Sequence, residues 1–146
     1  MTVTEQLSTL GQILAHGDIT TLFQPIVSLS ERRILGYEAL SRGPSNSPLH
    51  SPINLLATAR QAGRLNELEM ACRRSACRRY SQGALRGKLF LNASPETLLE
   101  AAHKPGRTLE LLNAYGIPAE QVTAQFAEQQ AQLEAGQEIG RASCRE

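Results

Sequence analysis

The spacing of apolar residues along the chain alternates between the period of a helix and the period of a strand. Within residues 1–18 the apolar side chains recur every three or four positions, which predicts a helix that begins after Thr4 and ends at Gly17. Residues 21–27 and 34–40 are short apolar runs of the kind that form strands. The beginning of the chain therefore predicts one helix followed by two strands.

The rest of the chain continues this alternation. The further predicted elements are a helix from Ser51 to Gly63, a helix over 66–80, a strand over 88–93, a helix beginning at Ser94, a helix over 109–115 and a strand over 121–127. Pro25 has no N–H to donate, so the strand over 21–27 is expected at a sheet edge or at an irregularity. Strands that alternate with helices favour an α/β fold with mostly parallel strands and flanking helices.

The helix over 66–80 predicts one buried stripe and one charged face. Leu68, Cys72, Ala76 and Tyr80 repeat every four residues and are expected to be buried together. Its arginines are interpreted as a solvated face rather than as a surface for an anion or a partner. They are Arg73, Arg74, Arg78 and Arg79.

Composition and charge exclude several classes of protein. The chain has 146 residues, which is typical of one domain, and 15 Lys and Arg against 14 Asp and Glu leave a net charge of +1. This balance provides no field for a nucleic-acid polymer or an anionic membrane. No apolar run approaches the roughly 20 residues of a membrane span, and the first residues do not read as a signal peptide. We therefore expect no nucleic-acid polymer as partner and no membrane segment.

The cysteines indicate the compartment. Cys72, Cys77 and Cys144 are odd in number and lack Cys-x-x-Cys spacing, which argues against a disulfide framework and a zinc site. A cytoplasmic location fits such a pattern best. Cys72 and Cys77 are interpreted as small packing residues.

A carboxylate and a guanidinium near the end of the second predicted strand are the first candidates for chemistry. The period of two places Glu38 on one face with Ile34, Gly36 and Leu40, where an unpaired carboxylate is costly unless a cation or a metal meets it. Two interpretations remain open at this point: an ion pair between Glu38 and Arg42, or a metal-binding Glu beside an Arg that grips phosphate.

Three short motifs follow one another in a specific order: Phe-Gln-Pro-Ile-Val at 23–27, Glu-Ala-Leu-Ser-Arg at 38–42, and Asn-Ala-Ser-Pro at 92–95. In order and spacing they resemble the EAL-domain family, the bacterial phosphodiesterases that hydrolyse cyclic di-GMP. The resemblance covers about residues 22–128 and implies a TIM-like (β/α) barrel. Such barrels need about 250 residues, so the chain is expected to form a partial barrel, its N-terminal half.

The resemblance also implies roles for individual residues. Glu38 and Asn92 would be ligands of Mg²⁺ or Mn²⁺, Arg42 would hold a substrate phosphate, and Gln24 and the backbone near Leu40 would line the dinucleotide. Independently of the family, Glu38 and Asn92 lie at or just past predicted strand ends, where the sites of (β/α) barrels form. A helix cap or a turn is the alternative role for Asn92.

The third family element departs from its pattern. The family reads Glu, Ile or Leu, Thr and Glu, whereas this chain has Gln125, Phe126, Ala127 and Glu128. An amide at position 125 keeps an oxygen donor but loses the negative charge, so affinity for a hard metal should fall. Glu128 remains as a candidate ligand. The paired Asp and the catalytic Lys of the family do not occur, so no complete set of catalytic residues is expected.

Three functions remain open on the sequence. The chain is part of a cyclic di-GMP phosphodiesterase and inactive by itself, or a degenerate EAL domain that binds the nucleotide or a protein without turnover, or a remnant without function. We expect an N-terminal helix at 1–18, the EAL portion at 19–135 and a tail outside the family at 136–146. The unclosed barrel also predicts a homodimer or self-association.

Overall fold

The structure is a computed structural model that describes residues 2–83, 85–96 and 106–126. Most of the helix predicted after Ser94 lies outside the described residues. Glu128, Cys144 and the predicted tail also lie outside them.

One four-stranded sheet organises the described chain. Its strands are β1 (Thr20–Ser28), β2 (Arg33–Arg42), β3 (Lys88–Ala93) and β4 (Val122–Phe126), in the order β1-β2-β3-β4. β1 pairs with β2 as an antiparallel hairpin, whereas β2, β3 and β4 run parallel to one another. The prediction of mostly parallel strands is therefore confirmed.

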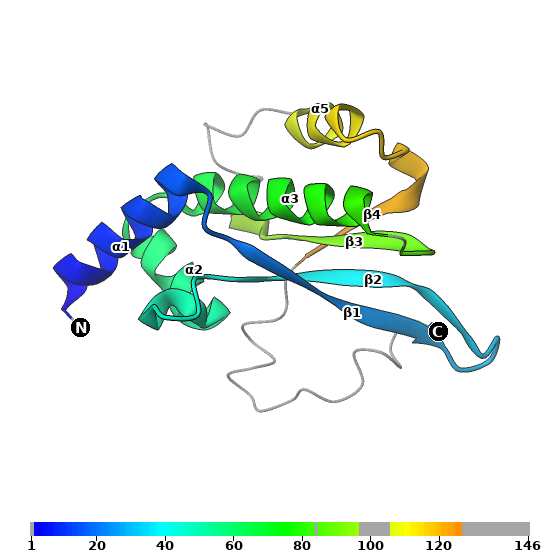
Figure 1. The fold of residues 1–146 in the computed structure, drawn as a ribbon, viewed down its shortest axis with the longest axis horizontal. Helices are drawn as coiled ribbons and strands as arrows, with labels where there is room; N and C mark the ends of the chain where they lie inside the picture. The colour runs from blue at the N-terminus through cyan, green and yellow to red at the C-terminus, as the bar shows by residue number, and fades with distance from the viewer. Residues whose placement is uncertain (1, 84, 97–105, 127–146) are drawn as a thin grey trace.

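Helices connect the parallel strands and cover the sheet (Figure 1). They are α1 (Val3–His16), α2 (Pro52–Gln61), α3 (Leu65–Gln82) and α5 (Arg107–Ala114), with short 3-10 turns at Pro48–His50 and Ala119–Gln121. α3 runs along the sheet beside β3, and α5 lies next to α3 on the same side. α1 lies near α2, beyond the sheet. This order of elements is that of consecutive βα units.

The first helix begins two residues earlier than expected. Thr2, not Thr4, is the N-cap, because Thr2 Oγ1 accepts from the backbone N–H of Glu5 at 3.1 Å while a carboxylate oxygen of Glu5 accepts from the N–H of Thr2 at 2.7 Å. A cap at Thr4 would have Leu7 three residues later, which cannot reach back in this way. Gly17 ends the helix with φ 68°, as predicted.

Two clusters of buried residues form the core. One joins α1, α2 and the start of α3, and the other joins α3 and α5 to the sheet. Within the predicted stripe on α3, Leu68, Ala76 and Tyr80 are buried and Cys72 is half-buried. The stripe therefore contacts both clusters and holds α3 at the centre of the molecule.

The strand that contains Pro25 lies where its lack of an N–H is tolerated. β1 is the edge strand of the sheet, and its register to β2 shifts between Ile26 and Val27. Both features agree with the prediction of an edge or irregular strand. A buried hydrogen bond of 2.8 Å from Thr21 Oγ1 to Ser75 Oγ ties this strand to α3.

Candidate functional site

Glu38 lies inside β2 and not at its end, because the strand continues to Arg42. Glu38 is 2% exposed, and its register partners are Gln24 on β1 and Phe90 on β3. The predicted apolar face is incomplete, since Ile34 is 44% exposed. Pairing between β2 and β3 begins only at Gly36, so Ile34 lies before the covered part of the strand.

The other positions of the first motifs surround Glu38. Gln24 is exposed on the edge strand directly opposite Glu38, and Leu40 is half-buried opposite Leu22. Arg42 is the last residue of β2, where its Nη1 donates to the carbonyl oxygen of Ser41 at 3.0 Å. The two motifs are thus brought together by the β1–β2 register.

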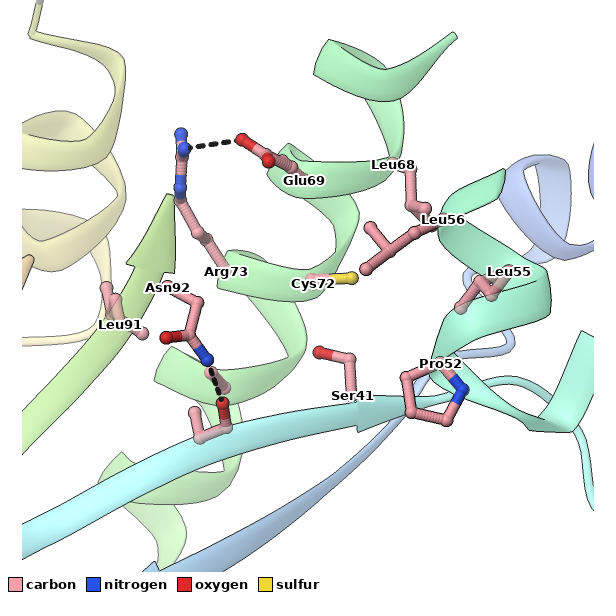
Figure 2. Close-up of a pocket in the computed structure, with 12 residues that line it drawn as sticks. Ser41, Pro52, Leu55, Leu56, Leu68, Glu69, Cys72, Arg73, Leu91 and Asn92 are labelled. Carbon is pink, nitrogen blue, oxygen red and sulfur yellow. Dashed lines mark hydrogen bonds and ion pairs between the residues drawn. The ribbon is translucent and has the colours of Figure 1, made fainter. Parts of the chain in front are cut away.

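Asn92 is fixed at the C-terminal end of β3. Its Nδ2 donates to the carbonyl oxygen of Ala39 on β2 at 3.2 Å, a bond drawn as the dashed line from Asn92 in Figure 2. This bond joins the Asn-x-Ser-Pro motif to the residue after Glu38. Of the two amide atoms only Oδ1 can accept, so a cation or a donor group of a ligand would meet Oδ1.

Gln125 is the register partner of Asn92 on β4. Both therefore lie at the same level near the C-terminal ends of parallel strands, and Asn92 was predicted at such an end. Glu38 lies closer to the middle of the sheet, in the register row that contains Phe90 and Thr123. The structure thus brings together Gln24 with Glu38 and Asn92 with Gln125. The roles that the resemblance implies for these residues stay predictions.

A pocket lies between the ends of β2 and β3 and the helices α2 and α3 (Figure 2). Its cavity volume is about 70 Å³. Leu55, Leu56, Leu68 and Leu91 are among its apolar walls. Ser41, Glu69, Cys72 and Asn92 supply polar groups. Asn92 therefore belongs both to the strand end and to the lining of this pocket.

Sequence reasoning missed two buried charges beside Asn92. Arg73 Nη2 donates to Glu69 Oε2 at 3.1 Å, and the two side chains are 7% and 9% exposed. The interpretation of Arg73 as part of a solvated face is therefore wrong, although Arg74, Arg78 and Arg79 are exposed. The signal was present, since a Glu and an Arg four residues apart face each other on a helix.

Burial disfavours the thiolate form of the two cysteines in this region. Burial raises the pKa of Cys72 to about 11, while a hydrogen bond with Ser41 acts in the opposite direction. Burial also raises the pKa of Cys77 to about 11. A thiolate is the reactive form, so neither cysteine is activated near neutral pH. Their interpretation as packing residues is consistent with these values.

The donors present fit a hard cation in kind but not in number. Mg²⁺ and Mn²⁺ prefer several oxygen ligands, usually including more than one carboxylate. Glu38 offers a carboxylate, whereas Asn92 and Gln125 are amides. Within residues 2–83, 85–96 and 106–126, no group of three or more His, Cys, Asp or Glu could hold a metal ion. These residues therefore do not fit a complete Mg²⁺ or Mn²⁺ site.

No curated protein is significantly similar to the chain. No helix in the described part of the chain is both long and apolar enough to cross a membrane.

Solved structures share the fold. The FimX EAL domain from Pseudomonas aeruginosa bound to c-di-GMP is 26% identical, with a TM-score of 0.66 over 91% of this chain and 54% of that chain. A standalone EAL protein from Vibrio cholerae O395, also in a c-di-GMP-bound form, is 32% identical, with a TM-score of 0.53 over 77% and 46%. BlrP1 from Klebsiella pneumoniae, as a manganese and cyclic di-GMP complex, is 23% identical, with a TM-score of 0.63 over 82% and 30%.

The chain spans about half the length of the FimX domain and of the Vibrio protein. The expected partial (β/α) barrel is thereby confirmed. The sequence profile of the EAL domain matches residues 6–144. This match does not test the predicted bounds 1–18, 19–135 and 136–146, which stay predictions. The chain belongs to the EAL domain family.

Proposed function

We propose that the chain carries part of the cyclic di-GMP site of a metal-dependent EAL phosphodiesterase and that residues 1–146 alone bind the nucleotide without hydrolysing it. The observation that carries the proposal is the junction of two motifs. Asn92 bonds to the carbonyl of Ala39, which directly follows the buried Glu38. Polar groups of both motifs thus meet at neighbouring parallel strands, where barrel sites form.

The chemistry of the nucleotide suits the residues nearby. Cyclic di-GMP carries two phosphodiester anions, and a guanidinium at a strand end can grip one of them with charge-assisted hydrogen bonds. Arg42 occupies such a position at the end of β2. The exposed amide of Gln24 can donate and accept, as a guanine edge or a ribose requires.

The lack of turnover follows from the donor set. We assign Mg²⁺ or Mn²⁺ only to a domain in which Glu128 and further carboxylates complete the ligands. The free cysteines of the described chain are compatible with the cytoplasm, which we propose as its location.

A second candidate function is a receptor that binds the nucleotide without any metal. Gln125 favours it, because Gln125 lies beside Asn92 in register and lacks the charge of the family's Glu. The variant Gln125→Glu distinguishes the two functions by its effect on nucleotide binding. If the site is that of a metal-dependent enzyme, Gln125→Glu places a carboxylate beside Asn92, and Mn²⁺ should then strengthen nucleotide binding. In a receptor, Gln125→Glu should leave binding unchanged with Mn²⁺ or with EDTA.

The binding proposal is tested by calorimetric titration of the purified chain with cyclic di-GMP. We expect saturable binding, weakened about tenfold or more by Arg42→Ala, since a charge-assisted hydrogen bond contributes about 1.5–3 kcal/mol. Arg86→Ala is the matched control, because Arg86 is exposed and lies just before the N-terminal end of β3, whereas Asn92 lies at its C-terminal end. Chromatography after incubation with Mn²⁺ should show no linear dinucleotide. Its appearance, or equal effects of both Arg variants on affinity, would contradict the proposal.

A further inference from the structure

Three elements hold the short segment that follows β3. Asn92 donates to Ala39 of β2, and the backbone N–H of Ser94 donates to Glu69 Oε1 of α3 at 3.0 Å. The carboxylate of Glu96 accepts from Arg60 of α2 at 2.9 Å. The segment that begins with Asn92 is therefore held by one strand and two helices.

The hydrogen bond between Ser94 and Glu69 is more deeply buried than the ion pair between Arg60 and Glu96. Glu69 and Ser94 are 7% and 4% exposed, whereas the side chain of Glu96 is 53% exposed. An exposed pair contributes little, but a buried carboxylate that accepts a backbone N–H cannot be replaced by water without rearrangement. The contact of Glu69 with Ser94 is therefore the stronger restraint on the segment.

The carboxylate of Glu69 is itself fixed. Its second oxygen accepts from Arg73, and Arg73 Nη1 lies 3.4 Å from Thr108 Oγ1 of α5 as its donor. The pair thus connects α3, α5 and the segment after β3. Such a network holds the orientation of each member because all of them are buried or half-buried.

We infer that Glu69 is a positioning residue: through the N–H of Ser94 it sets the direction in which the chain leaves β3, and thereby the orientation of the Asn92 side chain. The inference rests on the proposed function in so far as Asn92 serves the nucleotide site. Without the carboxylate, Ser94 loses a buried acceptor, and the segment has to shift to find another. Asn92 then leaves the carbonyl of Ala39.

The first test compares two Glu→Gln changes on the same helix. Glu69→Gln removes the buried charge and leaves a single acceptor oxygen, because an amide nitrogen only donates. When that oxygen accepts from Arg73, the N–H of Ser94 faces the NH₂ group and has no acceptor. Glu67→Gln is the matched control, because Glu67 makes an exposed ion pair with Arg64 at 2.8 Å. In ¹⁵N-labelled protein without nucleotide, we expect Glu69→Gln to shift the Asn92 side-chain amide signals and to speed hydrogen exchange at Ser94 about tenfold. The control should change neither.

A second variant keeps the positioning role testable if Glu69→Gln does not fold. Glu69→Leu with Arg73→Met replaces the buried pair by apolar groups, a change that is often neutral or stabilising. It leaves no unpaired charge but still removes the acceptor of Ser94. A merely structural role predicts unchanged Asn92 signals and unchanged affinity in this variant. Positioning predicts shifted signals and about tenfold weaker binding of cyclic di-GMP.

The outcomes separate the two proposals. If the unaltered chain does not bind cyclic di-GMP, the proposed function is overturned, and the Asn92 signals with the Ser94 exchange rate alone decide the role of Glu69. If the unaltered chain binds but both Glu69 variants keep its Asn92 signals, Ser94 exchange and affinity, the positioning role is overturned.

Discussion

The cysteines of α3 show how burial sets the behaviour of single residues in this chain. Cys77 is 0% exposed, and Cys72 lines the pocket beside the buried Glu69 and Arg73. Desolvation raises the pKa of both thiols to about 11. Glu69 and Arg73 form a buried ion pair beside Cys72. One face of α3 therefore carries both buried thiols and a buried ion pair.

These thiols should make the free energy of unfolding depend on pH in the alkaline range. A thiol ionises near pH 8.5 in the unfolded chain. The folded pKa values are about 11, so below about pH 8 both states hold the proton and the stabilisation is complete. As pH rises from about 9 to 11, the unfolded state loses protons first. Stability should then fall by up to about 1.4 kcal/mol per pH unit for each thiol.

Urea unfolding between pH 7.5 and 10.5 measures this slope. A Cys144→Ser background removes the thiol outside the described residues, and Cys72→Ala with Cys77→Ala provides the comparison. The comparison variant should lose stability less steeply above about pH 9. Equal slopes in the two proteins would mean that the thiols ionise alike in both states.

At the scale of elements, the pairing of β2 with β3 requires a glycine. The ladder begins with Gly36 opposite Lys88. A Cβ on Gly36 would lie 2.2 Å from the carbonyl oxygen and 2.8 Å from the nitrogen of Lys88. No side-chain rotation can relieve a clash with backbone, so the strands would have to separate just before Glu38.

Gly36→Ala should therefore destabilise the fold by about 1–3 kcal/mol, or more, as overpacking does. Gly11→Ala is the control, since a Cβ there meets only Arg64 Nη1 at 3.6 Å and Gly11 is inside α1. Alanine is the better helix former, so this change should stabilise by up to about 1 kcal/mol. Chemical denaturation measures both effects, and a neutral Gly36→Ala would refute the close approach.

For the whole molecule, the two outer strands of the described sheet differ. β1 contains Pro25 and a register shift, both of which hinder pairing with another strand. β4 has neither feature within Val122–Phe126, and Val122 packs against the cluster formed by α3, α5 and the sheet. We therefore expect any association to use the backbone edge of β4.

Self-association should appear in light scattering across a concentration series, with a thermal midpoint that depends on concentration. Thr123→Lys on β4 should reduce association, because lysine on an edge strand opposes strand pairing. Leu22→Lys, at a position 49% exposed on β1, should have less effect. A monodisperse monomer at all concentrations would contradict the prediction.

The sequence by itself determined the elements and the family. Strand and helix periods are local, so β3 could be predicted at residues 88–93, and Gly17 could be predicted to end α1. The order of three short motifs was sufficient to indicate the EAL domain. One local feature was not predicted, namely the N-cap at Thr2, which depends on the paired hydrogen bonds between Thr2 and Glu5.

Only the tertiary structure decided which polar groups meet. The bond from Ser94 to Glu69 joins residues 25 apart, and the bond from Asn92 to Ala39 joins residues 53 apart. No local spacing encodes such contacts, because they depend on how α3 packs on the sheet and on the register of β2 with β3. The spacing of Glu69 and Arg73 allows them to pair, but the burial of Arg73 depends on tertiary packing, because its side chain also contacts Thr108 of α5.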